Sequence, residues 1–113
     1  MSPELIDHFR NPRNVGELPA PAVTVEASNP ICGDILRLSA LVVDGRVVEV
    51  GYKVRGCAAS IACGSALTEL MAGPLRSVTR EEVERAVGGL SNESKHAAEL
   101  CADAAGALVR ALS

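Results

Sequence analysis

Apolar residues alternate with polar ones along three stretches in the first half of the chain, a pattern that predicts strands with one buried face. Asp44-Gly45 separates the second stretch from the third and predicts a type I′ hairpin, because that turn needs a positive φ at both central positions. The inward positions are Val23, Val25 and Ala27, then Leu36, Leu38, Ala40 and Val42, then Val48, Val50, Tyr52 and Val54. The pattern therefore predicts a three-stranded antiparallel meander.

Helical spacing replaces this alternation at both ends of the chain. Ser2-Pro3-Glu4 has the composition of a helix start, and Asn11-Pro12 ends that helix. A second helix follows Cys57 and stops at Gly73-Pro74, and Thr79 begins a third that stops at Gly88-Gly89. The last runs from Asn92-Glu93-Ser94 to about Ala111. We expect an α+β two-layer sandwich, with helices packed on one face of the sheet, in a single domain over residues 1–113.

Composition excludes several classes of function. The chain has 113 residues, a net charge of −3, one Tyr, one Phe and no Trp, so nucleic-acid binding has neither a basic surface nor stacking rings. No apolar run reaches the length of a membrane span, so no membrane partner is expected. The charged N-terminus is unlike a secretion signal, and a cytoplasmic location is expected.

The four cysteines are the main candidates for chemistry. Disulfides are rare in cytosolic proteins, so the plain alternative is that all four are small buried hydrophobes. The context of Cys32 argues against this. Gly33 separates Cys32 from Asp34, and residues two apart in an extended segment point the same way. A thiolate and a carboxylate facing one point are a reasonable pair of metal ligands.

Cys57 lies at the junction between the third predicted strand and the helix that follows it. Unpaired N–H groups and the positive end of the helix dipole favour a thiolate there. His96, at the start of the last helix, could supply a third ligand there, although such a histidine is more often a cap or a surface residue. Cys63 is expected to pack in the core, and His8 to be a partly exposed helix residue.

Four segments of the chain form a recognisable combination: NPRNVG (11–16), NPICGD (29–34), GCAASIAC (56–63) and KHAAELCADAAGALVRAL (95–112). With these segments the chain resembles the IscU/NifU-type scaffold proteins of iron–sulfur cluster assembly (the NifU N-terminal domain-like family). The resemblance covers essentially the whole chain. It implies an α+β sandwich fold, which agrees with the hydrophobic pattern.

The resemblance also implies a function. Such a scaffold is not an enzyme. It accepts sulfur from a cysteine desulfurase, receives iron and electrons from donors, builds a transient [2Fe–2S] cluster and passes it to apo acceptor proteins, as a monomer or a cluster-bridged dimer. Zn²⁺ often occupies the same site. The family's ligands match Cys32, Asp34, Cys57 and His96.

One position and one segment depart from the family pattern. The third family cysteine follows the histidine directly, where this chain has Ala97. Cys101 is one helical turn further on and shares a helix face with Ala97, so it either replaces the missing ligand and sulfur acceptor or packs away. The Leu-Pro-Pro-Val-Lys segment read by a dedicated chaperone is also missing, and Leu90-Ser91-Asn92-Glu93-Ser94 stands before Lys95-His96 instead.

Three other functions remain open. The chain could be a zinc-binding sulfur acceptor that activates a desulfurase without building a cluster. It could be a thiol hydrolase with Cys57 as nucleophile and His96 as base. It could also be a family member that keeps protein interactions but has lost cluster chemistry together with its third cysteine.

Overall fold

The computed structural model describes residues 2–112, and three long strands form most of its sheet. These are β1 (Val23–Ser28), β2 (Ile35–Val43) and β3 (Arg46–Arg55), paired antiparallel in that order. They confirm the predicted meander. The predicted inward position of Val48 is wrong: its side chain is 54 % exposed, because Leu41 pairs with Glu49 and Val42 with Val47, so that Val48 lies at a β-bulge. The β2–β3 turn has positive φ at Asp44 (52°) and at Gly45 (76°), as a type I′ turn requires.

A fourth strand, β4 (Gly73–Pro74), was not predicted. The sequence places Gly73-Pro74 only as a helix stop, whereas the structure pairs these two residues with Arg46 and Val47 at the outer edge of β3. The N–H of Leu75 also donates to the carbonyl of Gly45 at 2.8 Å. The sheet therefore has four strands rather than three, because the chain leaving the second helix runs along a free strand edge.

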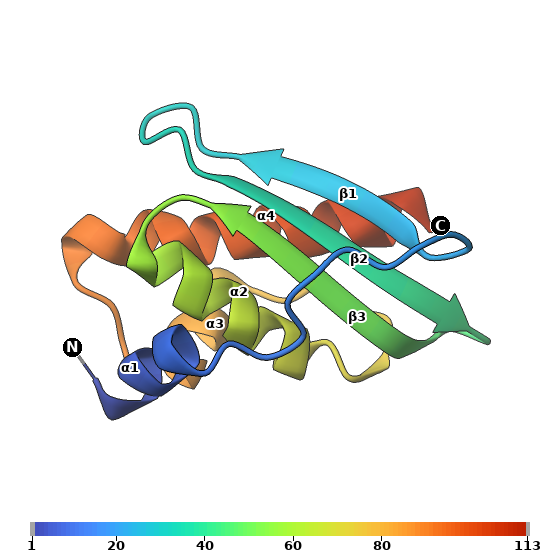
Figure 1. Cartoon of the computed structure of the whole chain (residues 1–113), viewed down its shortest axis with the longest axis horizontal. Coiled ribbons are helices and arrows are strands. Elements are labelled where there is room, and N and C mark those ends of the chain that lie inside the picture. Colours follow the sequence, from blue (N-terminus) through green and yellow to red (C-terminus); the bar gives the residue numbers. More distant parts are fainter. Residues whose placement is uncertain (1, 113) are drawn as a thin grey trace.

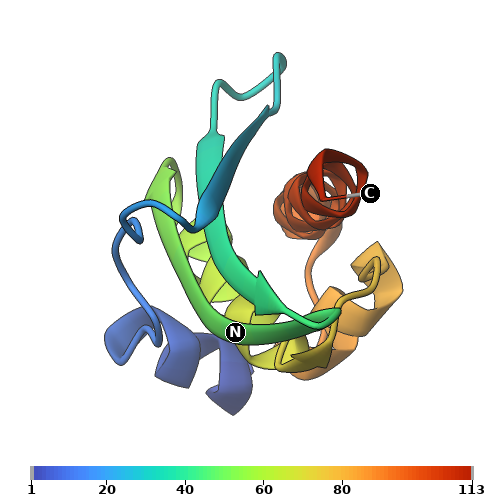
Figure 2. The same cartoon turned by 90° about the vertical axis from the view of Figure 1, so that its right-hand side faces the viewer.

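Four α-helices accompany the sheet: α1 (Pro3–Arg10), α2 (Ala58–Leu70), α3 (Arg80–Ala86) and α4 (Lys95–Ala111), the last preceded by a 3₁₀ turn, η1 (Asn92–Ser94). Helices α2, α3 and α4 lie on the concave side of the curved sheet, and α1 lies against α2 (Figures 1 and 2). The predicted caps are present, since Ser2 Oγ accepts from the N–H of Leu5 and Thr79 Oγ1 from that of Glu82. None of the helices described here could cross a membrane.

The core lies between the sheet and helices α2 and α4. It is built from the inward residues of the strands and the facing residues of these helices: Leu36, Leu38, Ala40, Tyr52, Ala62, Cys63, Ala66, Leu67, Ala97, Leu100, Cys101, Ala104 and Leu108. At one end of this sandwich, the β1–β2 loop, the start of α2 and the start of α4 come together (Figure 1). That end carries the candidate site.

Candidate metal centre

The β1–β2 loop presents Cys32 and Asp34. Residues Asn29 and Asp34 close the loop, because the N–H of Asn29 donates to the carbonyl of Asp34 at 2.9 Å. The N–H of Gly33 donates back to the carbonyl of Asn29 at 2.8 Å, and Gly33 has a φ of 76° that favours glycine. The turn leaves Cys32 exposed while Asp34 is only 5 % exposed.

Cys57 is the N-cap residue of α2, and its thiol is exposed. Its Sγ lies 3.4 Å from Asp34 Oδ2 and 3.4 Å from Ser60 Oγ. The N–H of Cys57 is also directed at Asp34 Oδ2, at 3.5 Å. The start of α2 therefore holds a thiol and several donors against the carboxylate from the β1–β2 loop, as expected for a helix N-terminus.

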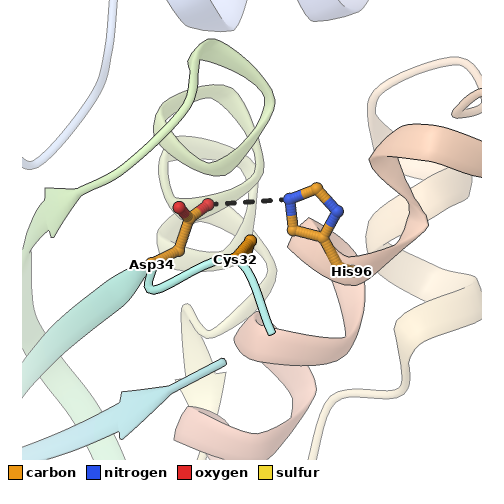
Figure 3. A group of neighbouring side chains, drawn as sticks. All are labelled: Cys32, Asp34 and His96. Atoms are coloured by element: carbon orange, nitrogen blue, oxygen red, sulfur yellow. Dashed lines mark ion pairs between the residues drawn. The ribbon is translucent and has the colours of Figure 1, made fainter. Parts of the chain in front are cut away.

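His96 comes from the first turn of α4 and closes the site from the other side. Its Nε2 lies 3.6 Å from Asp34 Oδ2 and 3.6 Å from Cys57 Sγ. The side chain is 27 % exposed, so the ring is held by the protein and still reached by solvent. Figure 3 shows the imidazole of His96 directed at Asp34, with Cys32 beside them.

The spacing of these atoms suits a metal ion. Cys57 Sγ, Asp34 Oδ2 and His96 Nε2 form a triangle with sides of 3.4, 3.6 and 3.6 Å. Ligands of a tetrahedral zinc ion, with bonds of about 2.0–2.3 Å, lie roughly 3.3–3.8 Å apart. Donor atoms of Cys32, Asp34 and His96 also lie within 4.8 Å of one another. Asp34 and His96 thus lie close to both exposed thiols, and the carboxylate, the imidazole and the Cys57 thiol have the spacing of ligands to one metal ion.

Asp34 is poised to remain ionised in this environment. Burial opposes the charged form, but hydrogen bonds from Ser60 and Cys57 together outweigh it, and the pKa of the Asp34 carboxyl lies below its ordinary value. The facing His96 lowers this pKa further when it is protonated. The carboxylate is therefore available as a ligand at neutral pH.

Cys63 and Cys101 lie outside this group of side chains. Both are buried in the core on facing helices, and Cys101 is only 1 % exposed. Burial raises the pKa of Cys63 to about 12 and that of Cys101 well above its usual value, so both are protonated thiols. Cys101 does share a helix face with Ala97, but that face is the buried one. The structure confirms core packing for Cys63 and does not bring Cys101 to the site.

Sequence reasoning missed two residues that shape the site. Ser60 donates from Oγ to Asp34 Oδ2 at 2.5 Å, and Gly56 lies directly against the same carboxylate. A serine three residues after an N-cap faces the same first turn, which is a signal that the sequence does contain. Predicting its partner needed the position of the β1–β2 loop.

The fold and these side chains define an α+β domain with a candidate metal-binding end, which carries two exposed thiols, a carboxylate and an imidazole. Comparison with known proteins identifies its family. The sequence profile described as NifU-like N terminal domain matches residues 1–112, and the chain belongs to this family.

Relatives and a solved structure agree with this assignment. An iron–sulfur cluster assembly scaffold protein IscU of Archaeoglobus fulgidus is 37 % identical over 107 residues, which cover 91 % of this chain and 70 % of that protein. The bifunctional protein NifU/MnmA of Rubrobacter xylanophilus is 44 % identical over 110 residues, 90 % of this chain and only 22 % of that protein. A NifU-like N-terminal structure from Brucella abortus has the same fold, with a TM-score of 0.78 over 96 % of this chain and 90 % of the other, at 18 % identity.

Proposed function

We propose that this chain is a scaffold on which an iron–sulfur cluster is assembled and from which it is released. The observation that carries this proposal is the meeting of Cys32, Asp34, Cys57 and His96 at one end of the sandwich, with both thiols exposed. The family membership and the name of the Archaeoglobus relative support the same function. On this proposal the protein binds and transfers its cargo and is not an enzyme.

The two exposed cysteines, Cys32 and Cys57, would accept the sulfur. A cysteine desulfurase would present a persulfide, and the thiolate of Cys32 or Cys57 would attack its outer sulfur while the desulfurase thiolate leaves. Two electrons from a donor then reduce each transferred sulfur to sulfide. A hollow of about 360 Å³ borders Cys57 and is lined by Leu5, Cys57, Ala58, Ala59, Gly89, Leu90, Ser91 and Ser94, so a partner's segment can reach this thiol. Cys101, buried in the core, is not accessible in this way.

The mixed ligand set suits a cluster that must be passed on. Four thiolates are typical of a permanently held cluster, whereas oxygen and nitrogen ligands exchange more readily on iron. Asp34 and His96 would therefore keep a [2Fe–2S] cluster labile enough for apo acceptor proteins to take it. One chain offers four donors, which is compatible with a monomer, and a cluster bridging two chains would give a dimer.

A zinc-binding sulfur acceptor, which activates a desulfurase without building a cluster, is the second candidate. The observation in its favour is the triangle of Cys57, Asp34 and His96, whose sides already match a tetrahedral zinc site. Donor atoms of Cys32, Asp34 and His96 lie within 4.8 Å of one another, so Cys32 would be the fourth ligand of such a site.

Anaerobic reconstitution with iron and sulfide separates the two candidates. The scaffold is expected to acquire visible absorption and to convert an apo-ferredoxin to its cluster-loaded form. A matched pair of variants locates the cluster: Cys57→Ser should abolish the absorption, while Cys63→Ala, six residues further along the same segment, should retain it. A colourless protein that keeps one zinc ion per chain would support the sulfur acceptor instead.

A further inference from the structure

Ser60 makes a short hydrogen bond within the site described above. Its Oγ lies 2.5 Å from Asp34 Oδ2, in the range of hydroxyl-to-carboxylate bonds assisted by charge. Both groups are nearly inaccessible, with Ser60 1 % and Asp34 5 % exposed. Such a bond in a region of low dielectric fixes the position of the carboxylate more firmly than a surface bond could.

Gly56 lies directly against the same carboxylate. A Cβ at this position would lie 2.5 Å from Asp34 Cγ and 2.7 Å from Oδ1, closer than non-bonded atoms approach. The carboxyl group therefore packs directly on the backbone of Gly56, in a space that any side chain would fill. Gly56 and Ser60 flank Cys57 in the sequence, so one short segment supplies a thiol and the cradle for its neighbouring carboxylate.

We propose that Ser60 is a positioning residue, which holds Asp34 in place to bind metal in the space that Gly56 leaves for the carboxylate. The hydrogen bond directs Oδ2 to the corner of the triangle with Cys57 and His96. It does not block coordination, because a carboxylate oxygen has lone pairs for both a donor and a metal. This inference rests on the proposed function in one respect: the site must take a metal ion.

Without Ser60, the carboxylate would lose its shortest hydrogen bond and would be held less firmly at its corner of the triangle. Hydrogen-bond partners behind a metal ligand typically account for 10–100-fold in metal affinity. We expect Ser60→Ala to weaken Co²⁺ and Zn²⁺ binding by about tenfold. Gly56→Ala should give a similar loss by a different route, since the new Cβ displaces Asp34 while the serine hydroxyl remains.

Co²⁺ titration in the absence of oxygen tests this directly, because Co²⁺ reports both affinity and ligand geometry in its visible spectrum. In Ser60→Ala we expect weaker binding and a changed ligand-field spectrum, with the sulfur-to-cobalt charge-transfer band retained. Ser60→Thr, which keeps the hydroxyl, should restore the parent spectrum. Ser65→Ala is the matched control: Ser65 is also buried on α2, but it bonds His8 and Arg13 instead.

The outcomes separate the two levels of the proposal. If Ser60→Ala and Gly56→Ala bind Co²⁺ with the affinity and spectrum of the parent, and differ only in melting temperature, Ser60 is a packing residue and the inference is wrong. If Ser65→Ala weakens binding as much as Ser60→Ala does, the effect is one of general stability and the inference is again wrong. If the parent protein binds neither Co²⁺ nor Zn²⁺, the proposed metal site is wrong, and the inference about Ser60 is wrong for that reason.

Discussion

Cys57 Sγ lies 3.4 Å from Asp34 Oδ2, although the two residues are 23 positions apart and come from different elements. The contact joins the N-terminus of α2 to the β1–β2 loop. A thiol and a carboxylate at this distance can bind one metal ion together, and the carboxylate is the more exchangeable ligand towards iron. On the proposed scaffold function, this pair would set the balance between retention of a cluster and its release.

Removing the carboxylate should shift that balance towards retention. We expect Asp34→Ala to hold a reconstituted [2Fe–2S] cluster several-fold longer than the parent, because a readily exchanging oxygen ligand is lost. The measurement is the decay of visible absorption in the presence of an apo acceptor. A variant that releases its cluster as fast as the parent would show that Asp34 does not control lability.

Cys101 should matter for stability and not for metal. Cys101→Ala removes a buried sulfur from the core, and we expect it to lower the free energy of unfolding by about 1 kcal/mol. Zinc affinity and cluster yield should stay at the parent values. Cys32→Ala should do the reverse, with little effect on stability because the side chain is exposed. Equal losses of cluster yield in the two variants would place Cys101 in the site after all.

His8 is buried, with 7 % exposure, and is not the partly exposed residue that the sequence predicts, so it should make stability depend on pH. Its Nδ1 is 2.7 Å from Ser65 Oγ in the contact of α1 with α2, and burial lowers the pKa of His8 below its ordinary value of 6.5. Arg13 also lowers this pKa, whereas Glu69 and Asp7 oppose the shift. Because the unfolded chain then binds a proton more readily than the folded one, stability is complete above pH 6.5 and declines as the pH falls below it.

Thermal unfolding at about pH 7.5 and about pH 5.5 checks this prediction. We expect the parent to melt several degrees lower at the acidic pH. His8→Gln cannot be protonated, and it should show a smaller difference between the two conditions. If the parent and His8→Gln lose the same stability on acidification, other groups are responsible.

The two helical glycines provide a matched pair for core packing. A Cβ at Gly64 would lie 2.5 Å from Tyr52 Cε2, and the ring is held in place because Tyr52 donates to the carbonyl of Ile61 at 2.8 Å. We expect Gly64→Ala to cost about 1–3 kcal/mol through overpacking.

The nearest atom to a Cβ at Gly106 is the end of the flexible Arg110 side chain, at 3.3 Å. Gly106→Ala should therefore stabilise the protein by about 0.5–1 kcal/mol through helix propensity. Urea unfolding of both variants measures the contrast. A Gly64→Ala variant as stable as Gly106→Ala would contradict the packing of Tyr52 against α2.

The long elements could be predicted from the sequence because local rules determine them. The alternation of apolar and polar residues predicted the three long strands, and Asp44-Gly45 predicted the hairpin between two of them. Ser2 and Thr79 predicted helix starts that the structure contains. The two-residue strand β4 could not be predicted in this way. It forms because the chain after α2 pairs with the edge of β3, and the local sequence pattern of Gly73-Pro74 does not indicate that pairing.

The site was predictable as far as ligand chemistry is local. Cys32, Asp34 and Cys57 stand in turns that present side chains, and His96 begins a helix. Helical spacing correctly placed Cys101 on the face of Ala97, but it could not show that this face is buried. The bond from Ser60 to Asp34 depends on the distance between two elements, which the sequence does not contain.

The most direct test of the scaffold function is the metal and acid-labile sulfide content of the protein purified without oxygen. The scaffold is expected to contain iron and sulfide in equal amounts, with visible absorption that disappears in Cys57→Ser and persists in Cys63→Ala. Protein that contains zinc without sulfide, and that gains no sulfide on reconstitution, would contradict the assembly of a cluster on this chain.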